Sequence, residues 1–152
     1  MKQKIRNIHR VVVHCAATPP SHDIGAYEIN QWHLSRGWRM IGYHFVVRRN
    51  GVLETGRMID VMPAANGKGL NHNTVAICYV GGLHEVTREP EDNRTREQIT
   101  TLKSLRKVLD VVLNDPEWVG HRDLSPDLNN DGKITSDEWL KDCPCFDVKT
   151  EY

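Results

Sequence analysis

Short runs of apolar residues recur along the chain at the length of buried β-strands. The first covers residues 8–14, where three valines precede a histidine. β-branched and aromatic residues in runs of this length favour strands over helices. The same pattern predicts four further strands, at residues 41–47, 52–55, 74–80 and 118–119. Asn50-Gly51 lies between the second and third of these strands, and this dipeptide predicts a β-hairpin there.

Two other segments carry apolar residues at helical spacing. In residues 95–114, Thr95 and Gln98 form a capping box that predicts a helix start. The apolar stripe that follows is expected to face the core, and its members are Ile99, Leu102, Leu105, Leu109, Val112 and Leu113. A shorter helix is predicted between an N-cap at Asp23 and a stop at Gly37.

The predicted elements follow one another as strand, helix, two strands, loop, strand, helix and strand. The loop at residues 58–72 is rich in Gly, Asn and Ala, and a loop of this length in a compact domain is often functional. This order predicts an α/β fold (an α+β mixed sheet) with a central sheet flanked by helices. At 152 residues, we expect residues 1–152 to form a single domain with its own core.

Composition and charge exclude several classes of partner. Lys and Arg together number 20, as do Asp and Glu, so nothing in the charge indicates nucleic acid or a charged membrane surface. No apolar run is long enough for membrane insertion. The basic residues 1–10 are followed by only three valines before His14, far short of a signal-peptide core. We therefore expect a protein that is made and folded in the cytoplasm, and we expect a monomer.

Histidines and cysteines near the predicted strand ends are candidate metal ligands. His14 ends the first strand, His121 follows the last strand, and Cys143 and Cys145 come one loop later. In a reducing compartment, cysteines near histidines indicate metal binding or catalysis rather than disulfides. Catalytic zinc takes three protein ligands and keeps one position open. Two histidines and one cysteine would supply these three ligands. The alternative for His14 is a structural role, as a half-buried histidine bonded to a backbone carbonyl.

A second metal signal is nested between these ligands, at residues 127–138. Its residues match the EF-hand calcium loop, with Gly132 at position 6. The residues at ligand positions 1, 3, 5, 7 and 12 are Asp127, Asn129, Asp131, Lys133 and Glu138, Lys133 through its backbone carbonyl. The alternative is an Asp/Asn-rich turn without an ion, because Pro126 excludes a regular incoming helix. We predict a calcium-binding insertion that helps the flanking ligands to converge.

Several motifs together resemble one family. They are V-V-V-H-C, R-G-W-R-M-I-G-Y-H-F-V-V-R-R-N-G, G-L-N-H-N-T-V-A-I-C-Y-V-G-G, V-G-H-R-D and K-D-C-P-C-F-D, in this order along nearly the whole chain. In them the chain resembles the type-2 N-acetylmuramoyl-L-alanine amidases, which include phage endolysins, and the related peptidoglycan recognition proteins. The resemblance implies a zinc amidase that cuts the amide between the lactyl group of N-acetylmuramic acid and L-alanine. Peptidoglycan or a muropeptide would be its substrate.

The resemblance also implies roles for individual residues. It makes His14, His121 and Cys143 the zinc ligands, and Cys143 is chosen over Cys145 because the family's ligand precedes a proline. It implies that Tyr43 is an active-site tyrosine and that Lys141 stabilises the oxyanion formed at the attacked carbonyl.

Four further positions concern the substrate groove and departures from the family. Asn71 matches the family and is predicted, with Trp38, to contact substrate. Some members have a Glu base on the strand that carries Cys78 here, and many have a histidine in place of Asn66. The residues that transfer protons are therefore left open.

The sequence leaves other classes of function to weigh. One is a peptidoglycan-recognition module without activity, although the presence of Cys143 favours the enzyme. Another is a calcium-dependent scaffold, which would not need Tyr43, Lys141 and Cys143 together. Among amidases, an endolysin-type lytic enzyme and a cytoplasmic muropeptide-recycling enzyme both fit.

Overall fold

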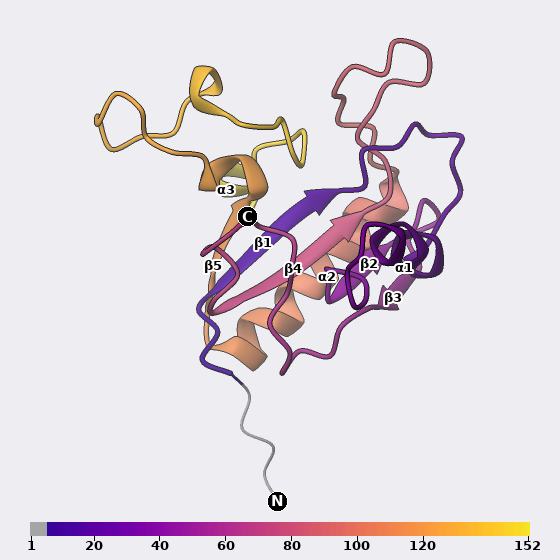
Figure 1. The fold of residues 1–152 in the computed structure, drawn as a ribbon, viewed down its shortest axis with the longest axis horizontal. Helices are drawn as coiled ribbons and strands as arrows, with labels where there is room; N and C mark the ends of the chain where they lie inside the picture. Colours follow the sequence, from indigo (N-terminus) through magenta and orange to yellow (C-terminus); the bar gives the residue numbers. More distant parts are fainter. Residues whose placement is uncertain (1–5) are drawn as a thin grey trace, which may run out of the picture.

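The computed structural model describes residues 6–152; residues 1–5, part of the basic N-terminal stretch, lie outside the described residues. The elements occur in the predicted order (Figure 1). The strands are β1 (Arg10–Cys15), β2 (Phe45–Val47), β3 (Leu53–Thr55), β4 (Thr74–Tyr79) and β5 (Glu117–Gly120). The helices are α1 (Ala26–Ser35), α2 (Arg96–Leu113) and α3 (Val148–Glu151), with 3-10 turns η1 (His121–Leu124) and η2 (Ser136–Glu138).

The strands form one mixed sheet, as predicted, in the order β3-β2-β4-β1-β5. β1 lies between β4 and β5 and is parallel to both, and β2 is parallel to β4. Only β2 and β3 are antiparallel, joined at the predicted Asn50-Gly51 turn, where Gly51 has a φ of 84°. The carboxyl ends of the four parallel strands, β2, β4, β1 and β5, therefore lie at the same edge of the sheet.

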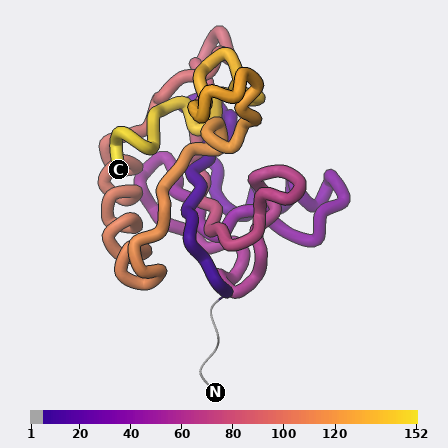
Figure 2. Tube along the Cα trace, turned by 90° about the vertical axis from the view of Figure 1, so that its left-hand side faces the viewer, coloured from indigo at the N-terminus to yellow at the C-terminus, as the bar shows by residue number. Residues whose placement is uncertain are grey.

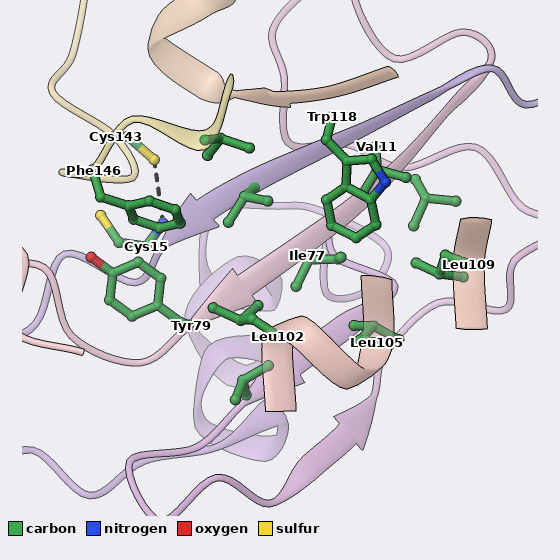
Figure 3. Packing of buried hydrophobic residues seen from close by; sticks show 14 of the residues in the cluster. Val11, Cys15, Ile77, Tyr79, Leu102, Leu105, Leu109, Trp118, Cys143 and Phe146 are labelled. Atoms are coloured by element: carbon green, nitrogen blue, oxygen red, sulfur yellow. Dashed lines mark hydrogen bonds between the residues drawn. The ribbon is translucent and has the colours of Figure 1, made fainter. Parts of the chain in front are cut away.

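Helices cover both faces of this sheet. On one face, α2 packs Leu102, Leu105 and Leu109 against Val11 of β1 and Ile77 of β4 (Figure 3). On the other face, Ile29 of α1 packs with Val46, Cys78 and Val80. Successive residues of β4 thus belong to different clusters, as the alternation of side chains in a strand requires. The apolar stripe of α2 is confirmed at Leu102, Leu105 and Leu109, with Leu113 packed against the cluster. Ile99 is only partly buried and lies outside the cluster, and Val112 is 51% exposed.

Helix α1 begins later than predicted. Its N-cap is Gly25, and Asp23 instead binds Arg48 through Oδ1 at 3.2 Å. Carboxylates replace the missing cap side chain: Glu28 accepts from the Gly25 amide and Glu54 from the Ala26 amide. A carboxylate brought in from β3 cannot be read from the local helix pattern, so the N-cap prediction at Asp23 is wrong.

The strand predicted at residues 41–47 is shorter in the structure. Gly42 and Tyr43 bond to the long loop instead of a strand, through Ala64 N to Gly42 O at 3.1 Å and Arg57 N to Tyr43 O at 2.8 Å. His44 still donates its amide to Ala76 O of β4 at 2.9 Å. The bonds of Gly42 and Tyr43 tie the loop, which has no helix or strand of its own between Thr55 and Thr74, against the segment that carries Tyr43.

The chain after β5 returns over the sheet edge. In both views the orange and yellow segment lies above the end of β1 (Figures 1 and 2). Arg122 N donates to Cys143 O at 2.7 Å, which closes the segment into a large loop. The short helix α3, which the sequence did not predict, then places buried Val148 in the core and Tyr152 against Trp118. No helix among residues 6–152 is long and apolar enough to cross a membrane.

Candidate metal centre and groove

Two neighbouring parallel strands bring His14 and His121 together. β1 and β5 pair with Val13 opposite Gly120, so His14 and His121 are the next residue on each strand path. Their ring centroids are 4.6 Å apart. The ring of His14 is buried, with 2% exposed, on the α1 side of β1. The fold therefore explains why two histidines far apart in the sequence face the same point.

Cys143 completes the cluster. Its Sγ lies 3.9 Å from His14 Nδ1, and the ligand atoms of His14, His121 and Cys143 all lie within 4.8 Å of one another. The amide of Cys15 donates to the same Sγ at 3.3 Å (Figure 3). Among residues 6–152, no other group of three or more His, Cys, Asp or Glu side chains meets so closely. Two imidazoles and one thiol form the donor set that zinc favours at catalytic sites.

The structure separates Cys143 from Cys145. Cys145 Sγ points to backbone carbonyls, with Asp142 O at 2.8 Å and Gly82 O at 3.3 Å, and it lies 4.0 Å from Cys15 Sγ. All four cysteines are free thiols. The pKa of Cys145 is raised, first by its contact with Cys15 and then by burial. Cys145 is thus outside the cluster.

Gly120 gives Cys143 its place. A Cβ on Gly120 would lie 2.7 Å from Pro144 Cδ, so only glycine allows the Cys143–Pro144 peptide to approach β5 this closely. Tyr79, at the end of β4, donates its hydroxyl to Pro144 O at 2.6 Å. The thiol is therefore held by packing against two strands rather than by a mobile loop.

Both histidines are held neutral. The pKa of His14 is lowered to about 3, by burial first and then by His121, while a bond to Asn66 raises it. The pKa of His121 is lowered by burial and by nearby Lys141. Neutral imidazole is the form that binds a metal, so protons compete weakly for these ligands near neutral pH.

Tyr43 and Lys141 adjoin the cluster. The ring centroids of Tyr43 and His14 are 5.3 Å apart, and burial raises the pKa of Tyr43 well above its usual value. Tyr43 therefore keeps its proton. Lys141 is exposed and close enough to lower the pKa of both histidines. His44, next to Tyr43, points away and accepts the Ala76 amide through Nδ1.

Two hollows meet at the cluster. One, of about 340 Å³, contains His14, Tyr43 and Cys143. The other, of about 640 Å³, runs between the long loop and the segment after β5. The predicted residues Trp38 and Lys141 line both hollows, and Asn71 lines the larger. Asn71 also accepts the amides of Ala65 and Asn66, so it shapes the loop that forms one wall.

Two buried residues near the cluster received no role from the sequence. Asn66 Oδ1 lies 2.7 Å from His14 Nε2, although the sequence identified it only as a departure from the family. His33 accepts the Gly42 amide through Nδ1, and its ring lies between Trp38 and Tyr43. The contact between Asn66 and His14 joins positions 52 residues apart, so it has no local sequence signal.

The loop at residues 127–138 is organised by its own backbone. Asp127 Oδ2 accepts the Gly132 amide, and Asn129 and Asp131 each accept the amide two residues later. Glu138 is 5% exposed and accepts the amides of Leu128, Asn129 and Thr135. Asp127 Oδ1 alone is buried without a hydrogen-bond partner. Calcium binding here stays a prediction, and so does the idea that calcium draws the zinc ligands together.

Comparisons with known proteins agree with this architecture. The endolysin of Klebsiella phage KP32 is 36% identical over 96% of this chain and 86% of its own. The solved N-acetylmuramoyl-L-alanine amidase LysC from Clostridium intestinale URNW superposes with a TM-score of 0.72 at 23% identity, over 96% of this chain and 82% of its own. Drosophila PGRP-LB superposes with a TM-score of 0.68 at 19% identity, over 98% and 82%. These two structures support the fold alone.

The family profile described as N-acetylmuramoyl-L-alanine amidase matches residues 4–139. The match includes His14, Tyr43 and His121, whereas Lys141 and Cys143 follow it in the sequence. The mixed sheet, the order of its elements and the endolysin relative agree with the match. The chain belongs to the N-acetylmuramoyl-L-alanine amidase family.

Proposed function

We propose that this protein is a zinc-dependent amidase that hydrolyses the bond between the lactyl group of N-acetylmuramic acid and the L-alanine of peptidoglycan. The observation that carries the proposal is the convergence of His14, His121 and Cys143 at the junction of two hollows. The family match and the endolysin relative support the reaction. The donor set supports the metal.

The residues present fit a catalytic zinc ion. His14 and His121 are neutral, and the Cys15 amide donates a hydrogen bond to Cys143 Sγ, the sulfur that would bind the metal. These three residues would hold the ion, and a site with three protein ligands keeps a fourth position for water. Zinc at such a site supplies a Lewis acid that polarises an amide carbonyl and activates water.

Lys141 is placed to stabilise developing negative charge. It is exposed at the rim shared by both hollows, and its charge reaches both histidines. A cation fixed near the attacked carbonyl interacts more strongly with the transition state than with the neutral substrate, so it raises the rate.

Tyr43 acts as a proton donor or an orienting group rather than as a base. Burial raises its pKa and also that of Cys78, its neighbour, so both stay protonated near neutral pH. Cys78 stands on the strand where some family members have a Glu base, and a buried thiol cannot replace a carboxylate. The Tyr43 hydroxyl can orient water or donate a hydrogen bond toward the leaving amine.

The biological setting we favour is lysis of the bacterial cell wall. The support is the endolysin relative, which aligns with nearly the whole chain. A recycling amidase would use the same chemistry on soluble wall fragments. Comparing hydrolysis of intact sacculi with hydrolysis of soluble muropeptides separates the two, and activity confined to soluble muropeptides would reject the lytic role.

The reaction is tested by digesting purified peptidoglycan and measuring new L-alanine amino termini. Wild-type protein is expected to release them, Cys143→Ser is expected to lose this release together with bound zinc, and Cys145→Ser serves as the matched control. Equal activity of wild type and Cys143→Ser would reject the metal centre. No release by zinc-loaded wild type would reject the amidase in favour of a recognition module.

A further inference from the structure

Asn66 lies where the long loop meets the metal centre. Its side chain is 98% buried, since only 2% of the residue is exposed, and its Oδ1 is 2.7 Å from His14 Nε2. Its backbone also lies close enough to the His121 side chain to raise the pKa of that histidine. One residue of the loop therefore contacts both histidines of the cluster.

The hydrogen bonds of Asn66 fix which way its amide faces. The Nδ2 group lies 3.1 Å from Leu70 O, a carbonyl that can only accept. It also lies 3.0 Å from Thr74 Oγ1, whose own proton goes to Asn71 O at 2.9 Å. Both partners must accept, so the NH₂ group faces them and the amide oxygen faces His14.

This orientation determines the tautomer of His14. Because Asn66 Oδ1 can only accept a hydrogen bond, His14 Nε2 must carry a proton and donate the hydrogen bond to that oxygen. A neutral imidazole then has its lone pair at Nδ1, the atom that faces Cys143 Sγ at 3.9 Å. The tautomer required for metal binding at Nδ1 is thus set before any metal arrives.

We propose that Asn66 is a positioning residue, which holds His14 in the Nε2–H tautomer and fixes its ring so that Nδ1 faces the metal centre. The proposal rests on the proposed zinc function but concerns a residue to which that function gives no role. Groups that accept the second N–H of a histidine ligand orient the ring and increase metal affinity, typically about 10- to 100-fold.

The loop is built to deliver this side chain. Asn71 Oδ1 accepts the Asn66 amide at 3.0 Å, and Asn71 Nδ2 donates to Gly67 O at 3.1 Å. Thr74, the first residue of β4, then anchors the Asn66 amide group to the sheet. The Asn66 oxygen is therefore fixed relative to β1, the strand that carries His14.

Two substitutions separate positioning from loop structure. Asn66→Asp keeps an oxygen facing His14 but loses both Nδ2 donations. Asn66→Leu keeps the branched shape, loses the same donations and also loses the acceptor. Zinc affinity is measured by competition with a chromophoric chelator, and the His14 tautomer is measured in metal-free protein by ¹⁵N NMR of the imidazole nitrogens. Thermal unfolding of the metal-free variants monitors the fold.

If Asn66 positions His14, Asn66→Asp retains zinc affinity within a few-fold and Asn66→Leu loses about 10- to 100-fold. Metal-free wild type and Asn66→Asp then show the Nε2–H tautomer, and Asn66→Leu shows a mixture. If Asn66 only braces the loop, Asn66→Asp binds zinc as weakly as Asn66→Leu or more weakly, which overturns the proposal. A predominant Nδ1–H tautomer in metal-free wild type also overturns it, whereas wild type without zinc affinity rejects the proposed function itself.

Discussion

His14, His121 and Cys143 come from three distant parts of the chain, whereas the residues of the 127–138 loop are contiguous. The three distant ligands meet within 4.8 Å because β1 and β5 end side by side and Gly120 admits Pro144. In the loop, side-chain oxygens of Asp127, Asn129, Asp131 and Glu138 accept amides of the loop itself.

The difference teaches how far a ligand motif can be trusted. The loop motif matches position by position, yet the side chains of Asp127, Asn129, Asp131 and Glu138 already accept backbone amides. No group of its carboxylates converges in the way the buried cluster does. The scattered residues His14, His121 and Cys143 are a weak signal in sequence, yet the folded sheet brings their ligand atoms within 4.8 Å of one another. Whether ligand atoms converge in space depends on the fold, and the spacing of residues in a sequence motif predicts it poorly.

The largest expected effect is a loss of catalytic rate when Lys141, beside the buried cluster, is replaced. Lys141→Ala should lower kcat by about 100- to 1,000-fold, the usual cost of removing one group that stabilises an oxyanion. Because Lys141 is exposed, the melting temperature and the zinc content should stay unchanged. Steady-state kinetics on soluble muropeptide gives the result, and Lys141→Arg is the control that keeps the charge. A loss confined to KM would contradict a role in the transition state.

A pH series distinguishes the cluster from the loop by stability. In metal-free protein the folded-state pKa is about 3 for His14 and about 4 for the buried His44, below the ordinary 6.5. The unfolded chain therefore binds more protons, and stability is lost as pH falls below about 6.5, by up to about 1.4 kcal/mol per pH unit for each histidine. Glu138, whose pKa is lowered by backbone donors, contributes stability that is fully present above about pH 4.5 and is lost only as the pH falls below that value. Urea unfolding at a series of pH values gives the profile, and stability that is constant from pH 7 to pH 5 would contradict it.

The close contact between Gly120 of β5 and Pro144 can be disrupted by adding a methyl group at Gly120. Gly120→Ala should destabilise the fold by about 1–3 kcal/mol, the usual cost of overpacking, because its Cβ would meet Pro144. The displaced Cys143 should also bind zinc more weakly. Denaturant unfolding measures the loss of stability, and chelator competition measures the loss of zinc affinity. Wild-type zinc affinity in Gly120→Ala would show that Cys143 is not placed by this contact.

The smallest effects belong to the loop. Glu138→Ala should lower the melting temperature by a few degrees without calcium, because three amides lose their acceptor. Calcium should raise the melting temperature of wild type less than this, and should not raise that of Asp127→Ala. Differential scanning calorimetry in chelator and in calcium makes the comparison. A larger calcium-induced rise in the melting temperature of wild type, absent in Asp127→Ala, would support the predicted calcium site instead.

Local patterns predicted most of the fold. The Asn50-Gly51 turn, the Thr95–Gln98 capping box and the β-branched runs each depend on neighbours in sequence, and the structure confirms them. The wrong predictions concern contacts between residues that are distant in sequence. Glu54 caps α1 from another strand, so Asp23 was assigned wrongly.

The candidate site shows the same division. His14 and His121 were identified at strand ends, where the sheet directs them. Choosing Cys143 over Cys145 needed the family resemblance, because two cysteines with one residue between them differ only in which backbone groups they meet. Asn66 received no role, since its contact with His14 crosses from a loop to a strand.

The central claim is that two histidine nitrogens and the sulfur of Cys143 bind one zinc ion. X-ray absorption at the zinc edge tests it most directly, on protein loaded with one equivalent of zinc. The account predicts one sulfur at about 2.3 Å and two imidazole nitrogens at about 2.0–2.1 Å, with the sulfur absent in Cys143→Ser and present in Cys145→Ser. A zinc environment of oxygen alone, or a sulfur that persists in Cys143→Ser, would contradict it.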